Sequence, residues 1–94
     1  MTDEDTPDYE ISYVPSAGRD IKRLKSNREV LVSIKATIDG LKKNPKPNGV
    51  TKLSDGSYRV RDGEFRIVYD VDDAEKTVTI NRVRDRKEVY KKNE

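Results

Sequence analysis

The stretch YRVRDGEFRIVY, residues 58–69, decides the fold of this chain, because large apolar side chains alternate with charged ones around an Asp-Gly pair. Alternation with period 2 predicts strands that turn one face toward a core. Asp-Gly is a strong signal for a two-residue turn of type I′, which needs positive φ at both positions. We therefore expect a β-hairpin whose two turn residues are Asp62 and Gly63.

A turn at these two residues fixes the pairing of the flanking strands. It would place Arg61 opposite Glu64 and Arg59 opposite Arg66. Residues that lie opposite each other share a face of the sheet. One face is then apolar and suited to a core, with Tyr58, Val60, Phe65, Ile67 and Tyr69. The other face is charged, with Arg59, Arg61, Glu64 and Arg66.

The N-terminal part of the chain predicts a strand followed by a helix. Residues 9–14, YEISYV, alternate and contain β-favouring side chains, and Pro15 then ends the strand and suits the first turn of a helix. The helix that follows has a single apolar face, at Ala17, Ile21 and Leu24.

A second helix is predicted from about residue 26 to about residue 43. Ser26 and Glu29 have the spacing of a capping box, in which the first side chain caps the helix. The prolines of NPKPNG, residues 44–49, end this helix, because proline cannot donate a backbone hydrogen bond. One face of the helix stays apolar, at Val30, Ile34, Ile38 and Leu41.

These elements predict an α+β domain with the order β-α-α-β-β-β. Helices come early and antiparallel strands come late, which indicates a helical hairpin packed on a small, mainly antiparallel sheet. Residues 1–8 are polar and lack periodicity, so we expect a disordered acidic arm there and a single domain over residues 9–94. The three late strands are expected at 58–61, 65–71 and 77–83.

Composition excludes several kinds of chemistry. The 94 residues include no cysteine and no histidine, so disulfides, thiolate chemistry and the usual zinc ligand and general base are absent. We therefore expect neither a metal nor another cofactor. Because no apolar run approaches 18 residues and cysteine is missing, we expect no membrane span and a cytoplasmic location.

Charge is distributed unevenly along the chain. The net charge is +2, but five acidic residues lie within the first ten positions and no Lys or Arg precedes Arg19. The other 13 acidic residues face 20 basic ones, which leaves residues 11–94 with a charge of +7. A basic domain favours a polyanionic partner, although a well-solvated surface would give the same balance.

The clustered arginines favour a phosphate ligand. Two guanidinium groups about 4 Å apart repel by about 1 kcal/mol in water and by about 4 kcal/mol at an effective dielectric constant of about 20. A bound anion would offset this repulsion, and the rigid donor fork of arginine suits phosphate. The sequence NRVRDRKEVYKK, residues 81–92, adds basic and aromatic side chains beside the hairpin, at Arg82, Arg84, Arg86, Lys87 and Tyr90.

Arginines beside an aromatic ring suit RNA, whose phosphates take the charge and whose exposed bases stack. The alternative is that these arginines are solvated strand positions and that Tyr90 packs on the core. The pattern alone leaves both interpretations open.

The sequence resembles the RelE/ParE superfamily of toxins from type II toxin–antitoxin modules. The likeness rests on YRVRDGEFRIVYDV followed by INRVRDRKEVYK, and the segments IKRLKS, IDGLKKNPKPNG and TKL also fit the helix–helix–strand frame of the superfamily. It covers roughly residues 9–91. In the RelE branch, the resemblance implies an mRNA endonuclease that cuts the codon in the ribosomal A site. The 2′-hydroxyl of the RNA attacks the adjacent phosphate, and no metal is needed.

The resemblance also implies a catalytic set. Arg66 and Arg84 match arginines that bind phosphate, and Tyr90 matches the C-terminal tyrosine. Arg59 and Arg61 match two positions that are lysine in the best-known RelE pattern. Because arginine effectively cannot lose its proton, these two residues would stabilise charge rather than act as bases.

Proton transfer would then fall to other groups. Many members of the superfamily carry histidine where this chain has Asp85, so the candidates for acid or base here are Tyr90, Asp85 and Glu88. Catalysis would otherwise depend on positioning and on charge stabilisation. Further contacts with RNA are expected from Arg82, Arg86, Lys87 and Lys52.

Two other functions stay open. In the ParE branch, the toxin poisons DNA gyrase and generally lacks the basic and tyrosine set. A RelE-fold protein without activity would act only as a binding module. For a toxin, the resemblance implies a cognate RelB-like antitoxin, for which electrostatics favours an acidic protein, in addition to the ribosome and mRNA.

Overall fold

The computed structural model describes residues 8–85, which form two helices packed on a five-stranded mixed sheet. The predicted α+β architecture is therefore confirmed, with one short strand added before the hairpin. The elements in chain order are β1 (Glu10–Tyr13), α2 (Pro15–Arg23), the 3₁₀ turn η1 (Leu24–Ser26), α3 (Arg28–Gly40), β2 (Thr51–Lys52), β3 (Tyr58–Asp62), β4 (Phe65–Asp72) and β5 (Thr77–Asp85).

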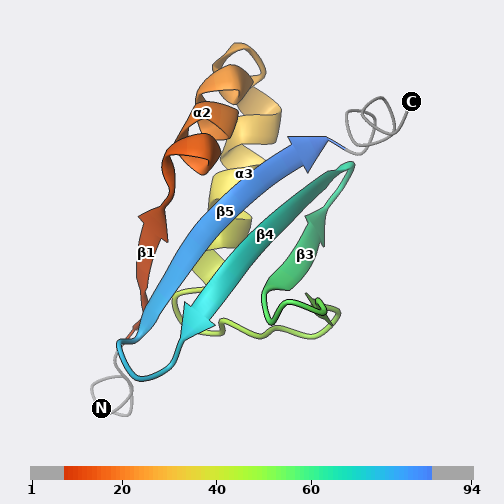
Figure 1. Cartoon of the computed structure of the whole chain (residues 1–94). Coiled ribbons are helices and arrows are strands. Elements are labelled where there is room, and N and C mark those ends of the chain that lie inside the picture. The colour runs from red at the N-terminus through yellow and green to blue at the C-terminus, as the bar shows by residue number, and fades with distance from the viewer. Residues whose placement is uncertain (1–7, 86–94) are drawn as a thin grey trace, which may run out of the picture.

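The strands are arranged in the order β1-β5-β4-β3-β2, and only β1 and β5 are parallel. Figure 1 shows α3 behind the sheet and α2 next to the upper part of β5. β1 pairs only with residues 77–80 of β5. The remainder of β5 has no strand on that side, and this open edge lies next to α2.

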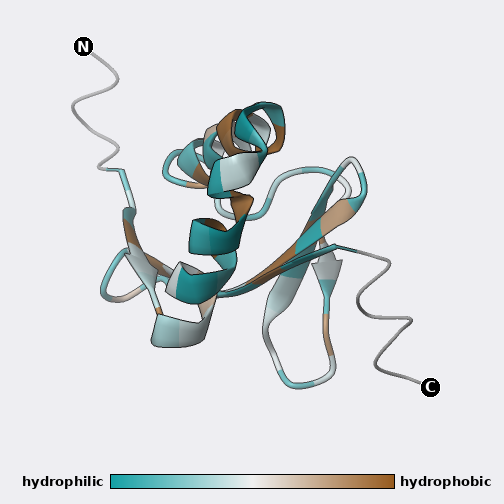
Figure 2. Ribbon diagram, turned by 90° about the horizontal axis from the view of Figure 1, so that it is seen from above, coloured by the Kyte–Doolittle hydropathy of each residue, from teal (hydrophilic) through white to brown (hydrophobic). Residues whose placement is uncertain are grey.

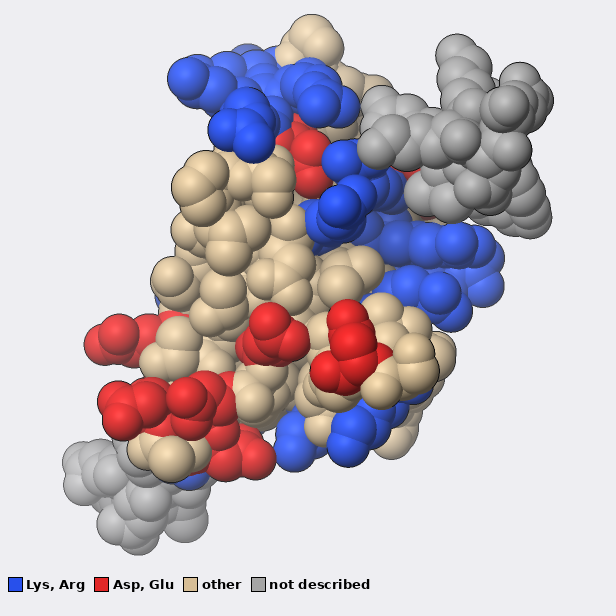
Figure 3. Space-filling model, viewed as in Figure 1, with Lys and Arg blue, Asp and Glu red and all other residues tan. Residues whose placement is uncertain are grey.

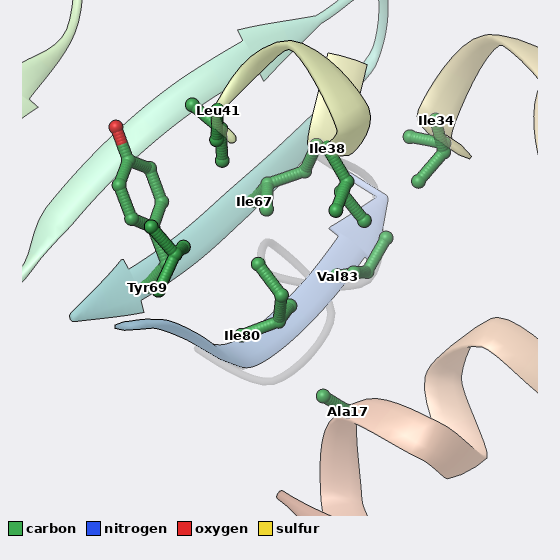
Figure 4. Close-up of a cluster of buried hydrophobic side chains, with 9 residues drawn as sticks. Ala17, Ile34, Ile38, Leu41, Ile67, Tyr69, Ile80 and Val83 are labelled. Atoms are coloured by element: carbon green, nitrogen blue, oxygen red, sulfur yellow. The ribbon is translucent and has the colours of Figure 1, made fainter. Parts of the chain in front are cut away.

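The core lies between α3 and one face of the sheet, with α2 closing its side (Figure 2). Ile34 and Ile38 of α3, with Leu41 at its C-cap, meet Ile67 and Tyr69 of β4, and Figure 4 shows Ala17 of α2 beneath the same cluster. The buried members of this cluster are Ala17, Ile34, Ile38, Leu41, Ile67, Tyr69, Val78, Ile80 and Val83. The predicted apolar face of the hairpin is confirmed, because Tyr58, Val60 and Phe65 also pack against this cluster.

The start of α3 differs from the prediction by one residue. Asn27, not Ser26, is the N-cap, and its Oδ1 accepts a hydrogen bond of 3.3 Å from the backbone N–H of Val30. Ser26 closes the 3₁₀ turn instead. Asparagine caps helices as well as serine does, so the competing cap one residue later decided the boundary. The helix ends at Gly40, before the expected residue 43.

The register of the hairpin also differs from the prediction. Asp62 pairs with Phe65, so the two turn residues are Gly63 and Glu64. Only Gly63 of these two has positive φ, at 62°, which is typical of a type II′ turn. The prediction that Arg59 lies opposite Arg66 is therefore wrong, because Arg61 occupies that position.

Hydrogen bonds from α3 account for this register. The two carboxylate oxygens of Asp62 accept from Ser33 Oγ at 3.0 Å each, and Oδ2 also accepts from Thr37 Oγ1 at 3.2 Å. These contacts keep Asp62 in β3, with its side chain on the helix side of the sheet. Moving the turn by one residue changes every pair but leaves each side chain on its predicted face, because the partners shift by two positions.

A β-bulge interrupts the pairing of β4 with β5. Val68 pairs with Arg82 and Tyr69 pairs with Ile80, which leaves Asn81 as an extra residue in β5. Because of this residue, Ile80 and Val83 both face the core, although three positions separate them. The residues Arg82 and Arg84 consequently face away from the core.

The predicted arm at residues 1–8 lies outside the described residues except for Asp8, which is exposed and forms an ion pair with Lys43 at 3.4 Å. The predicted site residues Arg86, Lys87 and Tyr90, and the candidate Glu88, also lie outside the described residues.

No helix within residues 8–85 has the length and the apolar character needed to cross a bilayer.

Candidate nucleic-acid interface

Five arginines form two parallel rows across the face of the sheet opposite the core. Arg61 pairs with Arg66, and Arg66 pairs with Arg84, so one row crosses β3, β4 and β5. The second row consists of Arg59, Val68 and Arg82. We call this set the arginine grid and define it as Arg59, Arg61, Arg66, Arg82 and Arg84.

The prediction that Arg59, Arg61 and Arg66 share a face is confirmed. Opposed residues on one face have Cβ atoms about 4.5–5.5 Å apart, so neighbouring guanidinium groups in a row can contact a single phosphate. The grid combines accessible and partly shielded side chains. Arg61 and Arg82 are exposed, and Arg59, Arg66 and Arg84 are half-buried.

Figure 3 shows how the charges separate on this side of the molecule: the blue Lys and Arg side chains gather toward the upper part and the red Asp and Glu side chains toward the lower part. The outer positions of β4 follow the same order, from Arg66 through Val68 to Asp70 and Asp72. Asp70 is satisfied locally, because its Oδ2 accepts from Asn81 Nδ2 at 3.0 Å. Along the outer face of β4 the charge therefore changes from positive at Arg66 to negative at Asp70 and Asp72.

Most of the grid lacks a compensating carboxylate. Within residues 8–85, no Asp or Glu oxygen forms an ion pair with Arg59, Arg61, Arg66 or Arg82. Three like charges in one row repel one another, and nothing in the described part of the chain neutralises the first two. This arrangement suits an external anion such as a phosphate group.

Arg84 is the exception, because it is tied to Asp20 of α2. The distance from Arg84 Nε to Asp20 Oδ2 is 3.6 Å, and the two side chains are 19% and 3% exposed. Asp20 Oδ2 also accepts a hydrogen bond of 2.9 Å from the backbone N–H of Val83. That N–H lies on the open edge of β5, where β1 has ended.

The structure does not bring every predicted residue to the grid. Lys52 pairs with Tyr58 and therefore lies on the helix side of the sheet, with Nζ 5.9 Å from the centre of the Tyr58 ring. Asp85 pairs with Phe65 and also faces the helix side. One predicted RNA contact and one candidate acid–base group therefore lie on the face of the sheet opposite the grid.

Two residues of this region were missed by sequence reasoning. Val68 is the one uncharged position in the rows of the grid, and its place follows from the register rather than from its own side chain. Asp20 could have been found from its spacing. Ala17, Ile21 and Leu24 define the apolar face of α2, and position 20 falls on the same face, so an acidic residue there indicates a buried carboxylate.

The chemistry available on the grid is charge stabilisation. Arginine provides five N–H donors in a fixed fork and no base near neutral pH. The described members of the grid can therefore bind phosphates and stabilise a negatively charged transition state. They do not supply an acid–base group, so that role must come from another residue.

Comparison with known proteins identifies the family. Residues 11–90 match a family model described as the ParE toxin of the type II toxin–antitoxin system, parDE. No curated protein matches the sequence.

Solved structures show the same fold. A RelBE toxin–antitoxin complex from Mycobacterium tuberculosis matches with a TM-score of 0.73 and 24% identity, over 83% of this chain and 98% of that one. The isolated RelE toxin of E. coli matches with a TM-score of 0.70 and 21% identity, over 90% and 94% of the two chains. A YoeB–YefM complex from Staphylococcus aureus matches with a TM-score of 0.67 and 27% identity, over 81% and 94%.

Proposed function

The chain belongs to the ParE toxin family of type II toxin–antitoxin systems, and we propose that it acts in the cytoplasm as a ribosome-dependent mRNA endonuclease of the RelE kind. The observation that carries this proposal is the arginine grid. Four of its five arginines have no ion-pair partner within residues 8–85, and a row of three runs across adjacent strands.

In the proposed reaction, the grid holds the RNA backbone on either side of the scissile bond. The 2′-hydroxyl attacks the adjacent phosphorus, the bond to the 5′-oxygen breaks, and a 2′,3′-cyclic phosphate forms. Negative charge increases on the phosphoryl oxygens in the transition state. Arg61, Arg66 and Arg84 lie in one row and would stabilise this charge, which is usually the largest single contribution to such catalysis.

The 2′-hydroxyl must lose its proton and the departing 5′-oxygen must gain one. We assign Tyr90 either to one of these proton transfers or, as the alternative, to stacking on the base next to the 2′-hydroxyl. No member of the grid can take a proton near neutral pH. A general acid or base typically contributes about 10²–10⁴-fold. Loss of the Tyr90 hydroxyl should therefore lower the cleavage rate by a similar factor if this residue transfers the proton.

The proposal is tested by mapping mRNA cleavage in a reconstituted translation reaction that contains the full-length chain. We expect cleavage within the codon of the A site, reduced at least about tenfold by Arg66→Ala and by Tyr90→Phe. Lys35→Ala is the control, because Lys35 is an exposed cation in the middle of α3, on the opposite side of the sheet from the grid. Absence of cleavage above buffer on stalled ribosomes would refute the proposal.

The second candidate function is inhibition of DNA gyrase, and the family description favours it, since it names ParE. In this case the basic face would contact gyrase rather than RNA. A supercoiling assay separates the two candidates: inhibition of gyrase without RNA cleavage would replace the first proposal. A chain that affects neither RNA nor gyrase would be a binding module of the RelE fold.

A toxin of this family requires a partner that restrains it. Several of the structural relatives are complexes of a toxin with the antitoxin RelB or YefM. We propose that this chain binds a cognate antitoxin, and that acidic side chains of that antitoxin contact the arginine grid. Co-expression with the neighbouring reading frame should then abolish toxicity, and high salt should weaken the complex.

A further inference from the structure

Asp20 is the only charged side chain that is buried within residues 8–85. Its place is the middle of α2, against the open edge of β5. Burial of a carboxylate is costly unless nearby groups compensate it. The contacts of Asp20 therefore show what this charge does in the molecule.

The backbone contact of Asp20 does not require a charge. The hydrogen bond from Val83 N–H to Oδ2, at 2.9 Å, would be accepted equally by an asparagine oxygen. Arg23 approaches the other oxygen at 3.9 Å, but its side chain is 61% exposed, so this pair contributes little. The contact that depends on the charge is the one with Arg84.

Arg84 is held in an unusual way. Its Nε atom is buried and has no hydrogen-bond partner within residues 8–85, and Asp20 Oδ2 lies 3.6 Å from it. The inner edge of the guanidinium therefore faces a buried negative charge. Because the guanidinium is planar and carries donors on more than one edge, this contact through Nε does not occupy its terminal nitrogens.

We propose that Asp20 is a positioning residue that orients the guanidinium of Arg84 for a phosphate group of RNA. This inference rests on the proposed function, because it assigns a phosphate to the row of Arg61, Arg66 and Arg84. Asp20 lies on a helix and is fixed by the backbone of β5, so it gives Arg84 a rigid support. Preorganised charge of this kind favours the transition state without reorganisation during the reaction.

If Asp20 orients Arg84, then Asp20→Asn should have an effect on cleavage that the loss of a negative charge alone would not produce. Asp20→Asn removes a negative charge near the grid, so non-specific binding of RNA should be unchanged or tighter. The cleavage rate should nevertheless fall by about tenfold to a hundredfold, because a misplaced group loses catalytic efficiency. We therefore expect kcat to fall while KM stays the same or decreases.

The experiment is a double-mutant cycle on the full-length chain. Single-turnover cleavage on programmed ribosomes is measured for the wild type, Asp20→Asn, Arg84→Ala and the double variant. If Asp20 acts through Arg84, the double variant cleaves as slowly as Arg84→Ala alone. Multiplication of the two losses, or an Asp20→Asn variant as fast as the wild type, would overturn the proposal.

Asp39→Asn is the control for the change in charge. Asp39 lies on α3, its side chain is 70% exposed, and its ion pair among the described residues is a surface pair with Lys42 at 3.7 Å. We expect its cleavage rate to stay within about twofold of the wild type, as is usual for an exposed charge far from the reaction. A similar loss in both variants would show that net charge, not orientation, is responsible.

A spectroscopic measurement keeps the inference testable without activity. In ¹H–¹⁵N spectra, the Nε–H signal that disappears in Arg84→Lys should also shift in Asp20→Asn. Addition of a 2′-O-methyl RNA hexamer, which cannot be cleaved, should move this signal in the wild type and move it less in Asp20→Asn. No shift in either experiment would refute the inference even if the wild type cleaves RNA. A shift without any cleavage would refute only the proposed function.

Arg84→Lys is the second variant, in case Asp20→Asn does not fold. Lysine keeps the positive charge but has no Nε–H that Asp20 could hold. We expect this variant to lose as much cleavage as Arg84→Ala, to within about threefold. A rate near that of the wild type would overturn the proposal, because charge alone would then suffice.

Discussion

Charged side chains at one end of the sheet neutralise one another, whereas most of those at the other end have no partner of opposite charge within residues 8–85. At the end near the β4–β5 turn, Tyr9 donates to Asp73 Oδ1 at 2.6 Å, and Lys46 Nζ lies 3.4 Å from Asp73 Oδ2. Lys46 also lies 5.6 Å from the centre of the Tyr58 ring. We call this the paired end. At the other end, four arginines of the grid have no carboxylate partner within residues 8–85.

We interpret the difference as one between surface charge that stabilises the fold and surface charge that the proposed function assigns to a ligand. The paired end is built from groups that neutralise one another, and its pKa values reflect this. The hydrogen bonds from Tyr9 and Lys46 lower the pKa of Asp73, and the hydrogen bond to Asp73 raises the pKa of Tyr9. Four arginines of the grid have no such neutralising partner within residues 8–85, so their charge remains available to an anion.

The largest expected effect comes from reversing one charge at each end. Arg66→Glu places a carboxylate in the middle of a row of arginines, and we expect RNA cleavage to fall by about 10²–10³-fold. The counterpart at the paired end, Lys46→Glu, should leave cleavage within about threefold. Both variants are compared in the reconstituted translation reaction. Equal losses at the two ends would remove the functional distinction between them.

The next effect is alkaline destabilisation through Tyr69, which is buried beneath Tyr58. Burial raises the pKa of Tyr69 to about 12. Because the pKa is raised in the folded state, this contribution to stability is complete below about pH 10 and is lost between about pH 10 and 12, for a total of about 2–3 kcal/mol.

The measurement for Tyr69 is urea unfolding at several alkaline pH values, with Tyr69→Phe as the comparison. The variant loses the hydrogen bond of 2.7 Å to Pro45 O and should be less stable at neutral pH. Its disadvantage should shrink as the pH rises above 10, since phenylalanine does not ionise. Parallel curves for the two proteins would contradict the assignment.

A smaller effect is the change in stability when one positive charge is removed, which should have opposite signs at the two ends of the sheet. Arg61→Thr relieves repulsion in the grid, so we expect a gain in unfolding free energy of less than about 1 kcal/mol at low salt. Lys46→Ala at the paired end should instead lower the melting temperature. Added salt should stabilise the wild type more than Arg61→Thr, because it screens the repulsion. A destabilised Arg61→Thr would show that the grid is already neutralised.

The smallest effect concerns acid. The pKa of Asp73 is lowered in the folded state, so its contribution to stability is present above the unfolded value of about 3.9 and is lost as the pH falls through the folded value. Asp73→Asn should therefore be less stable than the wild type near neutral pH, and the difference should disappear at low pH. Melting curves between about pH 6 and pH 2.5 provide the check.

Much of the fold could be predicted because the apolar pattern is local. The helical faces containing Ala17 and Ile34 and the apolar face of the hairpin follow from spacing alone. The register could not be predicted, since it depends on hydrogen bonds between Asp62 and two side chains of α3, far away in the sequence. The face on which each side chain lies was still predicted correctly, because side chains alternate with period 2 and the pairing is shifted by two positions.

The candidate site was predicted in part for the same reason. Arg59, Arg61 and Arg66 belong to one hairpin, so their shared face follows from alternation. Arg82 and Arg84 are different, because strict alternation from Ile80 would turn them into the core. The extra residue Asn81 prevents this, and no local signal in the sequence marks it.

The bulge at Asn81 also limits how this protein can change during evolution. A one-residue deletion or insertion between Ile80 and Arg84 would exchange the two sides of the strand, sending guanidinium groups into the interior and valine out into water. The length of this segment is therefore constrained in addition to its buried and charged side chains.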